Sequence, residues 1–490
     1  MRNLPGASFM AAIAASFISS ATTARVDLDW HAPNATAINN LTQVLNGSGV
    51  YGFIYNSSTT SAEAYGQYNW CNMPHVRATE YPRASAEFDL QYVELIHRHH
   101  KRTVYASNSF PVESYPWNCD DEDLFYYGQP RTGRESARTY WHGYISPENQ
   151  FVRGFRGSCQ FPQITFGGLE DSFQHGKDLY GVYHDLLRFL PHNANDKVNF
   201  RVTQNVITSE VGGMVINGMF STEENYPLYI QPNGYDPLEP TYPCPVSSNL
   251  FSAIRSGSNW TSHLTSASPL YATLDNISGV PPDDSGFHAS FDHYYDNLSA
   301  RQCHNKPLPC KIVDGQNSSA CVTQDIADNV YRLGNYEYSY IYRDDPRSLA
   351  ASATSYGVFL GQLTSHIRDV ITGKMNVIYR HNVAHDGSIS RLLSVLQLDL
   401  MVWPGMGSEV VFELYKKKTV SIAGENPSPP SSKSGYYIRV LWRGQILRSS
   451  NPSLGLMDML PVETLLAYLD GLVGSGASLI VGKCSGAIPL

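Results

Sequence analysis

The string HRHHKR at residues 97–102 concentrates basic and histidine side chains in a chain that is acidic as a whole. Arginine binds phosphate oxygens through a planar fork of N–H donors, and a neutral imidazole can attack phosphorus as a nucleophile. Arg98, His99 and Arg102 are therefore residue types that can hold one phosphate group and attack it. A solvated basic turn would have the same composition, so this string needs a second observation.

A second candidate is the pair His385 and Asp386, far along the chain. A carboxylic acid beside a phosphate site can protonate the leaving alkoxide and later deprotonate the attacking water. An imidazole at the same place can donate a hydrogen bond to the transferring phosphoryl group. A His-Asp dipeptide alone carries little information, so its value depends on whether the fold brings it to His99.

Both strings follow segments with the composition of β-strands. Residues 88–96 precede the first string and residues 375–379 precede the second, and further strands are predicted at 410–416 and 436–443. In open α/β sheets, ligands bind beyond the carboxyl ends of the strands. Side chains that follow residue 96 are therefore expected to project into a crevice at that edge of the sheet.

Three segments have the hydrophobic periodicity of amphipathic helices, at residues 176–191, 356–371 and 461–469. Strands and helices thus alternate at both ends of the chain, which is typical of a sheet covered by helices. We predict an α/β fold with a three-layer core, in which a mostly parallel sheet carries helices on both faces.

The predicted core consists of residues 25–204 and 366–490. Residues 205–365, between the two parts of the core, are rich in turns, glycosylation sequons and cysteines. We interpret them as an inserted, smaller and partly helical cap domain that lies over the mouth of the site.

Composition argues against two classes of protein. The 490 residues include 44 Asp and Glu against 35 Lys and Arg, a formal charge of −9, which argues against a nucleic-acid partner held by phosphate neutralisation. With 42% hydrophobic and 16% charged residues, the chain has the composition of a packed globular protein. It contains no run of 18 apolar residues, so we expect no membrane span.

The N-terminal residues and the sequons predict a secreted, extracellular glycoprotein. Residues 1–24 combine an early arginine, a mildly apolar centre and a run of small residues, which is typical of a signal peptide; a buried N-terminal helix is the alternative. We expect N-glycans on exposed loops at eight sequons. These are Asn34, Asn40, Asn46, Asn56, Asn259, Asn276, Asn297 and Asn317.

The eight cysteines are even in number, which fits up to four disulfides in an oxidising compartment. Their pairing cannot be inferred from the sequence. A zinc site of cysteines would need close pairs such as C-x-x-C, and the shortest spacing, from Cys303 to Cys310, does not supply one.

Together, the two strings resemble the histidine acid phosphatase branch of the phosphoglycerate-mutase-like superfamily, as a divergent, secreted member of fungal type. The nucleophile motif of that family, R-H-G-x-R-x-P, is matched at Arg98, His99 and Arg102. Its later His-Asp motif is matched at His385 and Asp386.

Other segments follow the family in the same order. Residues 163–183 resemble the Q-L-T-x-x-G segment and the helix after it, through Thr165, Gly168 and Gly176. Residues 406–415 and 436–447 resemble two later strands of the family core. The resemblance therefore covers both parts of the predicted core and little of the cap.

The resemblance implies a secreted acid phosphatase that hydrolyses phosphomonoesters without a cofactor. In such an enzyme His99 is the nucleophile and forms a phosphohistidine, and Asp386 is the proton donor to the leaving group. The phosphoryl oxygens are held by Arg98, Arg102, Arg201 and His385.

An acidic optimum with a bell-shaped profile is expected of that mechanism, because Asp386 must be protonated while His99 is neutral. The implied substrate is a small phosphomonoester, with phytate, sugar phosphates and a broad range all open. The sequence does not predict the oligomeric state.

Some positions depart from the family pattern. His100 replaces the glycine of the nucleophile motif and Val104 its proline, so the loop after His99 must accommodate a larger side chain without the backbone freedom of glycine. Ile207 stands where the R-x-T-x-x-x-R-T segment has its later arginine, which removes support around the phosphate site. Tyr180 replaces an arginine of the helix, and we expect this to affect packing.

Two other functions stay open. His97, His99 and His100, together with His385 or Asp386, have the ligand types of a zinc hydrolase, although the intervening arginines would repel a cation. The other is a catalytically impaired secreted protein that binds phosphorylated or glycan ligands, which the departures from the motif suggest. Tyrosines alternate along residues 336–342 and could line such a surface.

Overall fold

The strand that leads into the HRHHKR string is β1 (Phe88–Arg98), and it lies inside an eight-stranded sheet. The computed structural model describes residues 26–52, 54, 67–119, 142–149, 151, 154, 156–222, 226–418 and 432–490. The predicted signal peptide at 1–24 and the sequon at Asn56 lie outside the described residues.

The sheet is mixed, with the strand order β10-β8-β7-β1-β6-β2-β3 and with β9 paired to β8. Strand β6 is parallel to β1, β2 to β6 and β3 to β2, whereas β7 is antiparallel to β1 and β8 to β7. Strands β1, β2, β3, β6 and β8 therefore run in one direction, which confirms the mostly parallel sheet. The bounds are β2 (Val198–Val202), β3 (Leu228–Tyr229), β6 (Tyr379–Ala384), β7 (Glu409–Lys417), β8 (Tyr436–Trp442), β9 (Gln445–Ile446) and β10 (Leu460–Pro461).

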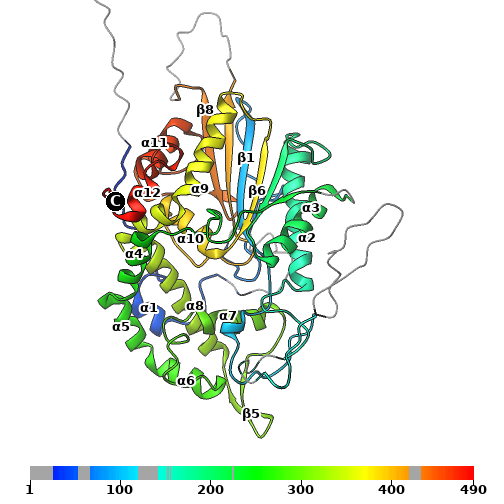
Figure 1. The fold of residues 1–490 in the computed structure, drawn as a ribbon, viewed down its shortest axis with the longest axis vertical. Helices are drawn as coiled ribbons and strands as arrows, with labels where there is room; N and C mark the ends of the chain where they lie inside the picture. Colours follow the sequence, from blue (N-terminus) through cyan, green and yellow to red (C-terminus); the bar gives the residue numbers. More distant parts are fainter. Residues whose placement is uncertain are drawn as a thin grey trace, which may run out of the picture.

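Helices cover both faces of this sheet (Figure 1). Side chains of β1 alternate between two cores: Val93 and Leu95 pack in the layer of α2 and α3, and Tyr92 and Ile96 pack in the layer of α9, α10 and α11. The predicted three-layer α/β core is confirmed. The helix bounds are α2 (Phe166–Tyr180), α3 (Val206–Phe220), α9 (Arg347–Ile371), α10 (Asp386–Val395) and α11 (Val462–Val473).

The remaining helices gather mostly below the sheet in the view of Figure 1. They are α1 (Leu41–Asn46), α4 (Pro245–Arg255), α5 (Ser258–Ser266), α6 (Ser268–Ser278), α7 (Asp292–Cys303) and α8 (Gln324–Ser339), with the hairpin of β4 (Cys310–Val313) and β5 (Gln316–Cys321). The short α12 (Ile480–Ser485) lies near the C-terminus.

The predicted domain limits stay a prediction, and the packing bears on them at both ends of the cap range. Helix α3 and strand β3, from the start of residues 205–365, pack on or pair with strand β2 of the sheet. Helix α9 begins inside that range and packs against β1. The part of the range that lies away from the sheet is therefore shorter than the predicted cap.

One predicted strand is misplaced. Residues 375–379 were expected to form it, but β6 begins at Tyr379 and ends at Ala384. The polar residues His381 and Asn382 are not typical of a buried strand, yet both are buried. The His381 Nδ1 lies 3.0 Å from the Tyr379 hydroxyl, and the Asn382 amide donates to the Leu95 carbonyl at 3.0 Å. These hydrogen bonds make the polar side chains compatible with a buried strand.

The other predicted strands at 88–96, 410–416 and 436–443 coincide with β1, β7 and β8 within two residues. The predicted helix at 176–191 is the second half of a longer element, because α2 continues as a π-helical turn at Gly181–Leu186.

All eight cysteines are paired, as the even count predicted. The disulfides are Cys71–Cys303, Cys119–Cys159, Cys244–Cys484 and Cys310–Cys321. Two of them join residues 232 and 240 positions apart, which restricts the unfolded chain far more than a short loop does.

Within the described ranges, none of the helices has the length and apolar character that a membrane crossing requires.

Burial contradicts one predicted glycosylation site. Asn297 lies inside helix α7, where its amide donates to the Asn108 carbonyl at 2.9 Å and its side-chain oxygen accepts from Arg301 at 2.7 Å. A glycan on this side chain would displace both contacts, which argues against modification of Asn297 in the folded protein. The other described sequon asparagines are exposed; they are Asn34, Asn40, Asn46, Asn259, Asn276 and Asn317.

Candidate active site at the carboxyl ends of β1 and β6

The parallel pairing of β1 with β6 brings the two chemically capable strings together. Arg98 is paired with Ala384 across the strands, and the His99 N–H donates to the Ala384 carbonyl at 3.0 Å. His99 and His385 therefore leave the sheet beside each other, with ring centroids 5.5 Å apart. This is the edge at which an open α/β sheet binds ligands.

The His99 ring is buried, and one hydrogen bond defines its tautomer. Its Nδ1 lies 3.0 Å from the His100 carbonyl, and because a carbonyl only accepts, Nδ1 carries the proton and Nε2 the lone pair. Burial lowers the pKa of His99 well below 6.5, and the charges of Arg98 and Arg102 lower it further. The ring is therefore neutral in mildly acidic solution and has the protonation state of a nucleophile.

Arg98 is buried and held on three sides. Its guanidinium lies 3.2 Å from a carboxylate oxygen of Asp386, donates to the Pro404 carbonyl at 2.5 Å and stands 4.8 Å from the centre of the Trp70 ring. Its Nε–H has no hydrogen-bond partner in the described part of the chain. A fixed guanidinium with an unsatisfied donor is suited to an anionic ligand.

Asp386 is the first residue of α10 and accepts several hydrogen bonds. Its Oδ2 accepts from the Trp403 indole N–H at 2.8 Å and from the Tyr338 hydroxyl at 3.4 Å, and its Oδ1 accepts from the Gly387 N–H at 2.7 Å. Burial raises the pKa of this carboxyl, but Arg98 and the Trp403 hydrogen bond outweigh that effect and hold the pKa below 3.8. The side chain is 23% exposed, so the site opens on this side.

Arg102 connects the site to the helical region below the sheet. Its guanidinium pairs with both carboxylate oxygens of Asp296 in α7, at 3.1 and 3.3 Å, and lies 4.2 Å from the centre of the Tyr105 ring. Its charge lowers the pKa of both His99 and Asp386. As with Arg98, the buried Nε–H has no partner among the described residues.

His385 is the residue before α10, and its Nε2 lies 3.0 Å from the Thr203 hydroxyl just after β2. A carboxylate oxygen of Glu239 is 3.7 Å from the same nitrogen. Burial lowers the pKa of His385 to about 4, and the charge of Asp386 opposes this only in part. The ring is therefore neutral at the positive end of the α10 dipole, a location that favours an anion.

Arg201, in β2, has side-chain contacts with residues outside this group. Its guanidinium donates to Gln362 of α9 at 2.9 Å and forms an ion pair with Asp236. Ile207, near the start of α3, is buried in the core between that helix and the sheet. The cations whose charge lowers the pKa of His99 are Arg98 and Arg102.

Several contacts of the site could not be found from the sequence. Trp403 belongs to no motif, and Asp296 lies in the weakly predicted middle of the chain. Thr203 is the first threonine of the R-x-T-x-x-x-R-T segment, but that match does not predict its contact with His385. Tyr338 is one of the alternating tyrosines at 336–342, but that alternation is more typical of packing than of a site. Its ring stacks on Trp403 with centroids 4.1 Å apart, so the two form one aromatic wall beside Asp386.

The unusual His100 is accommodated by a glycine on another segment. A Cβ placed on Gly407 would lie 2.4 Å from the His100 ring, so the ring occupies the space that a side chain at 407 would fill. Gly407 has φ +70°, a conformation that favours glycine. The glycine missing from the nucleophile motif is thus compensated by one that faces the replaced position.

The zinc ligands considered from the sequence do not form one group. His97 points from β1 towards α2, and the His100 Nε2 lies 3.0 Å from the His175 Nδ1 on that helix. His99, by contrast, faces His385. A hydrolytic zinc centre built from the full predicted set is therefore not supported.

The arrangement around His99 combines the groups that phosphoryl transfer needs. A neutral imidazole has its lone pair on Nε2, two guanidinium groups can neutralise phosphate oxygens, and a carboxyl group lies beside one of them. Each group is fixed by hydrogen bonds before any ligand arrives.

Comparison with known proteins adds distant relatives. No family model matches the chain. It is 24% identical to counting factor 60 of Dictyostelium discoideum over 381 residues, which cover 73% of this chain and 80% of that protein. It is 26% identical to 2-phosphoxylose phosphatase 1 of Xenopus tropicalis over 178 residues, 36% of this chain and 30% of that protein.

Two solved structures show a weak likeness in fold. The phytase of Klebsiella sp. ASR1 matches with a TM-score of 0.49 and 15% identity, covering 80% of this chain and 97% of that one. The phytase of D. castellii matches with a TM-score of 0.47 and 14% identity, covering 90% and 94%.

The fit of His100 against Gly407 predicts a specific loss of stability. We expect Gly407→Ala to lower the free energy of unfolding by about 1–3 kcal/mol, because the new methyl group overlaps the His100 ring and the positive φ is strained. Gly373→Ala is the control, since Gly373 has φ +68° but nothing within 4 Å of the added Cβ. Equal losses in the two variants, measured by urea denaturation, would show that the ring contact contributes nothing.

Proposed function

We propose that this chain, a distant homologue of the histidine acid phosphatases, hydrolyses small phosphomonoesters outside the cell through a phosphohistidine intermediate. The observation that supports this most is the state of His99: a buried, neutral ring whose Nδ1 is held by the His100 carbonyl, with Arg98 and Arg102 close enough to lower its pKa. Four disulfides and exposed sequons are consistent with an oxidising, extracellular compartment.

In the first step the Nε2 lone pair of His99 forms a bond to phosphorus, and the ester P–O bond breaks. Arg98 and Arg102 neutralise the phosphoryl oxygens through the donors that they do not already use, and His385 contributes a further hydrogen bond. The carboxyl group of Asp386 gives its proton to the departing alkoxide oxygen. The products of this step are an alcohol and phosphohistidine.

In the second step a water molecule attacks the phosphohistidine. The carboxylate of Asp386 takes a proton from this water, the P–N bond breaks, and His99 returns to its neutral state with inorganic phosphate released. Trp403 and Tyr338 keep the Asp386 carboxyl aimed at the same place in both steps, because each donates to its Oδ2. Arg201 keeps its proposed role through its buried Nε–H, which has no partner among the described residues, while its other two nitrogens contact Gln362 and Asp236.

The substrate we infer is a small phosphomonoester, with phytate, sugar phosphates and aryl phosphates as the classes to compare. Next to Asp386, the Glu239 carboxylate lies 3.7 Å from the His385 ring, and half-buried Tyr105 lies against Arg102. A second group with a negative charge would meet Glu239 there, so singly phosphorylated substrates are favoured over phytate.

A second candidate function rests on the ion pairs. Arg102 is already paired with Asp296, and Ile207 stands where the family resemblance has an arginine. Both features weaken the charge available to a transition state, so a protein that binds phosphate esters without turning them over is the alternative. Turnover of an aryl phosphate separates the two.

The nucleophile can be tested by His99→Ala. We expect hydrolysis of p-nitrophenyl phosphate to fall at least about a thousand-fold, because the covalent intermediate cannot form. A denaturing quench with labelled substrate should trap phosphate on the wild type and none on the variant. His192→Ala, at an exposed histidine, serves as the control for folding and purity. Residual activity near the wild-type level, or label on His99→Ala, would remove His99 from this role.

The proton donor can be tested by Asp386→Asn. Loss of the acid should slow an alkyl phosphate, whose leaving group is poor, by about 10²–10⁴-fold, and should slow p-nitrophenyl phosphate much less. The readout is kcat/KM for the two esters. Equal losses for both would mean that Asp386 acts only by orienting Arg98.

The pH dependence follows from two lowered pKa values. His99 stays neutral well below pH 6.5, and the Asp386 carboxyl, with its pKa held below 3.8, gains its proton only in acid. We therefore expect kcat/KM for an alkyl phosphate to rise as the pH is lowered from about 7 to about 4, until His99 is protonated. A pH series in constant ionic strength measures this, and an optimum above neutrality would contradict the assignment.

A further inference from the structure

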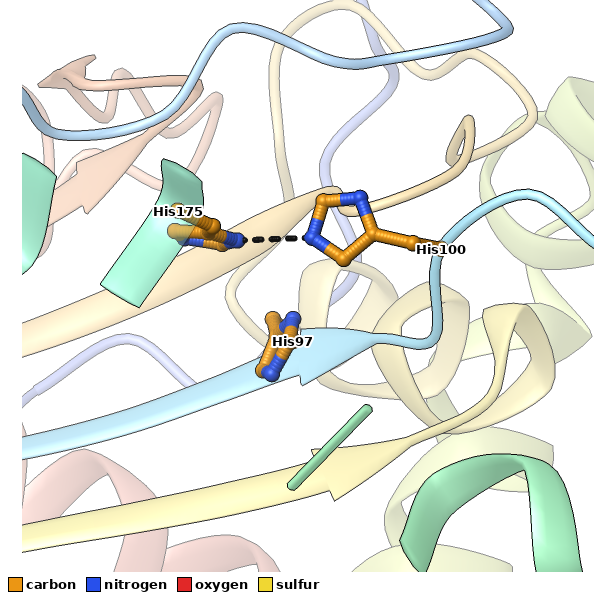
Figure 2. Close-up of side chains that lie close together, drawn as sticks. All are labelled: His97, His100 and His175. Atoms are coloured by element: carbon orange, nitrogen blue, oxygen red, sulfur yellow. Dashed lines mark hydrogen bonds between the residues drawn. The ribbon is translucent and has the colours of Figure 1, made fainter. Parts of the chain in front are cut away.

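Behind the candidate active site, three buried histidines converge on the other side of β1. His97, His100 and His175 each place one ring nitrogen so that the three atoms lie within 4.8 Å of one another. Figure 2 shows the rings approaching from the end of β1, from the loop after it and from helix α2, with a dashed line between His100 and His175.

Three of the six ring nitrogens in this group have no hydrogen-bond partner in the described part of the chain. Both ring nitrogens of His97 and the Nδ1 of His100 are buried and have no hydrogen-bond partner within the described ranges. A neutral imidazole has one N–H and one lone pair, and leaving such a group unmet costs about 1–3 kcal/mol. Native interiors seldom keep several unmet groups together unless a ligand, a water molecule or an ion takes them.

His175 is held in the way that metal-binding histidines are usually held. Its Nε2–H donates to a carboxylate oxygen of Glu409 at 3.0 Å, which leaves the lone pair on Nδ1 facing the other two rings. A carboxylate behind a histidine ligand fixes the tautomer and makes the ring a better donor to a metal. Glu409 is itself fixed, because it accepts from the Val76 N–H at 2.5 Å.

The charge balance around the group suits a divalent cation. A Glu409 carboxylate oxygen lies 3.0 Å from the His175 ring, and the His75 ring, which stacks on His175 with centroids 4.1 Å apart, is paired with Asp178 at 2.8 Å. The buried ammonium of Lys101 is paired with Asp171 at 2.9 Å, which limits its repulsion of a cation.

We propose that His97, His100 and His175 bind one divalent transition-metal ion, with zinc as the first choice, in the interior between β1 and α2. Three imidazoles are typical ligands of zinc and of neighbouring metals, and they do not suit calcium or magnesium. At Zn–N distances of about 2.0–2.1 Å, tetrahedral ligand atoms lie about 3.3 Å apart, so the three nitrogens need to close in from their present spacing. A water molecule completes the coordination.

The role of this ion is structural, and it takes no part in phosphoryl transfer. His100 contributes its ring to the metal group and its carbonyl to the Nδ1 of His99. The ion therefore ties the peptide that orients His99 to helix α2. The site and the phosphatase activity are separate claims, since either can fail while the other holds.

Metal content is the direct test. The full chain, without a histidine tag, should be secreted from a eukaryotic host in zinc-supplemented medium, passed over a chelating resin and measured by plasma mass spectrometry. We expect about one zinc per chain in the wild type and less than about a tenth of that in His97→Ala, in His175→Asn and in the double variant. Anomalous diffraction at the zinc edge should place the ion between the three rings.

The control is His381→Gln, at a buried histidine whose ring centroid is 4.8 Å from that of His97 but which lies outside the group. It should keep the metal. Because a variant can fail to fold, the wild type is also denatured, freed of metal with a chelator and refolded with or without zinc or cobalt. Cobalt should give the visible absorption of a tetrahedral site, and zinc should raise Tm. A metal-free wild type with no shift in Tm, or zinc retained by the folded double variant, would overturn the proposal.

Discussion

The parallel contact between β1 and β6 is the constraint on which the site depends. It sets Arg98 beside Ala384, so the residues that follow each strand enter one crevice. The ion pair between the Arg98 guanidinium and the Asp386 carboxylate, at 3.2 Å, then connects the segments that follow the two strands. Neither string could form the site without this pairing, because residues 103–384 separate them in the sequence.

The alternation of side chains along β1 separates two functions that the sequence presents as one. His97 points into the layer of α2, Arg98 points towards α10, and His99 lies beyond the last strand residue. Three adjacent residues therefore contribute to a buried histidine group, an arginine-carboxylate pair and a candidate nucleophile. The period of two along the strand separates His97 from Arg98, and the end of the strand after Arg98 separates His99 from His97.

Much of the core and the centre of the site could be predicted from the sequence, because strand composition, helical periodicity and the order of the two strings are local signals. Strand β6 was misplaced since its polar residues are buried by hydrogen bonds that no local pattern reveals. The contacts of Trp403 and Asp296 with the site depend on tertiary packing across distant segments. The pairing of Arg201 with Asp236, and the fit of His100 against Gly407, are likewise products of the fold.

Helix α7 carries Asp296, the partner of Arg102, and ends at Cys303, which is bonded to Cys71. Cys71 directly follows Trp70, whose ring covers Arg98. The helix that carries the partner of Arg102 is thus covalently tied to the segment that packs on Arg98. Such a crosslink limits how far helix α7 can move away from Trp70, so a ligand would meet Arg98 and Arg102 at a nearly constant separation. Ligands would then be selected by size before any reaction takes place.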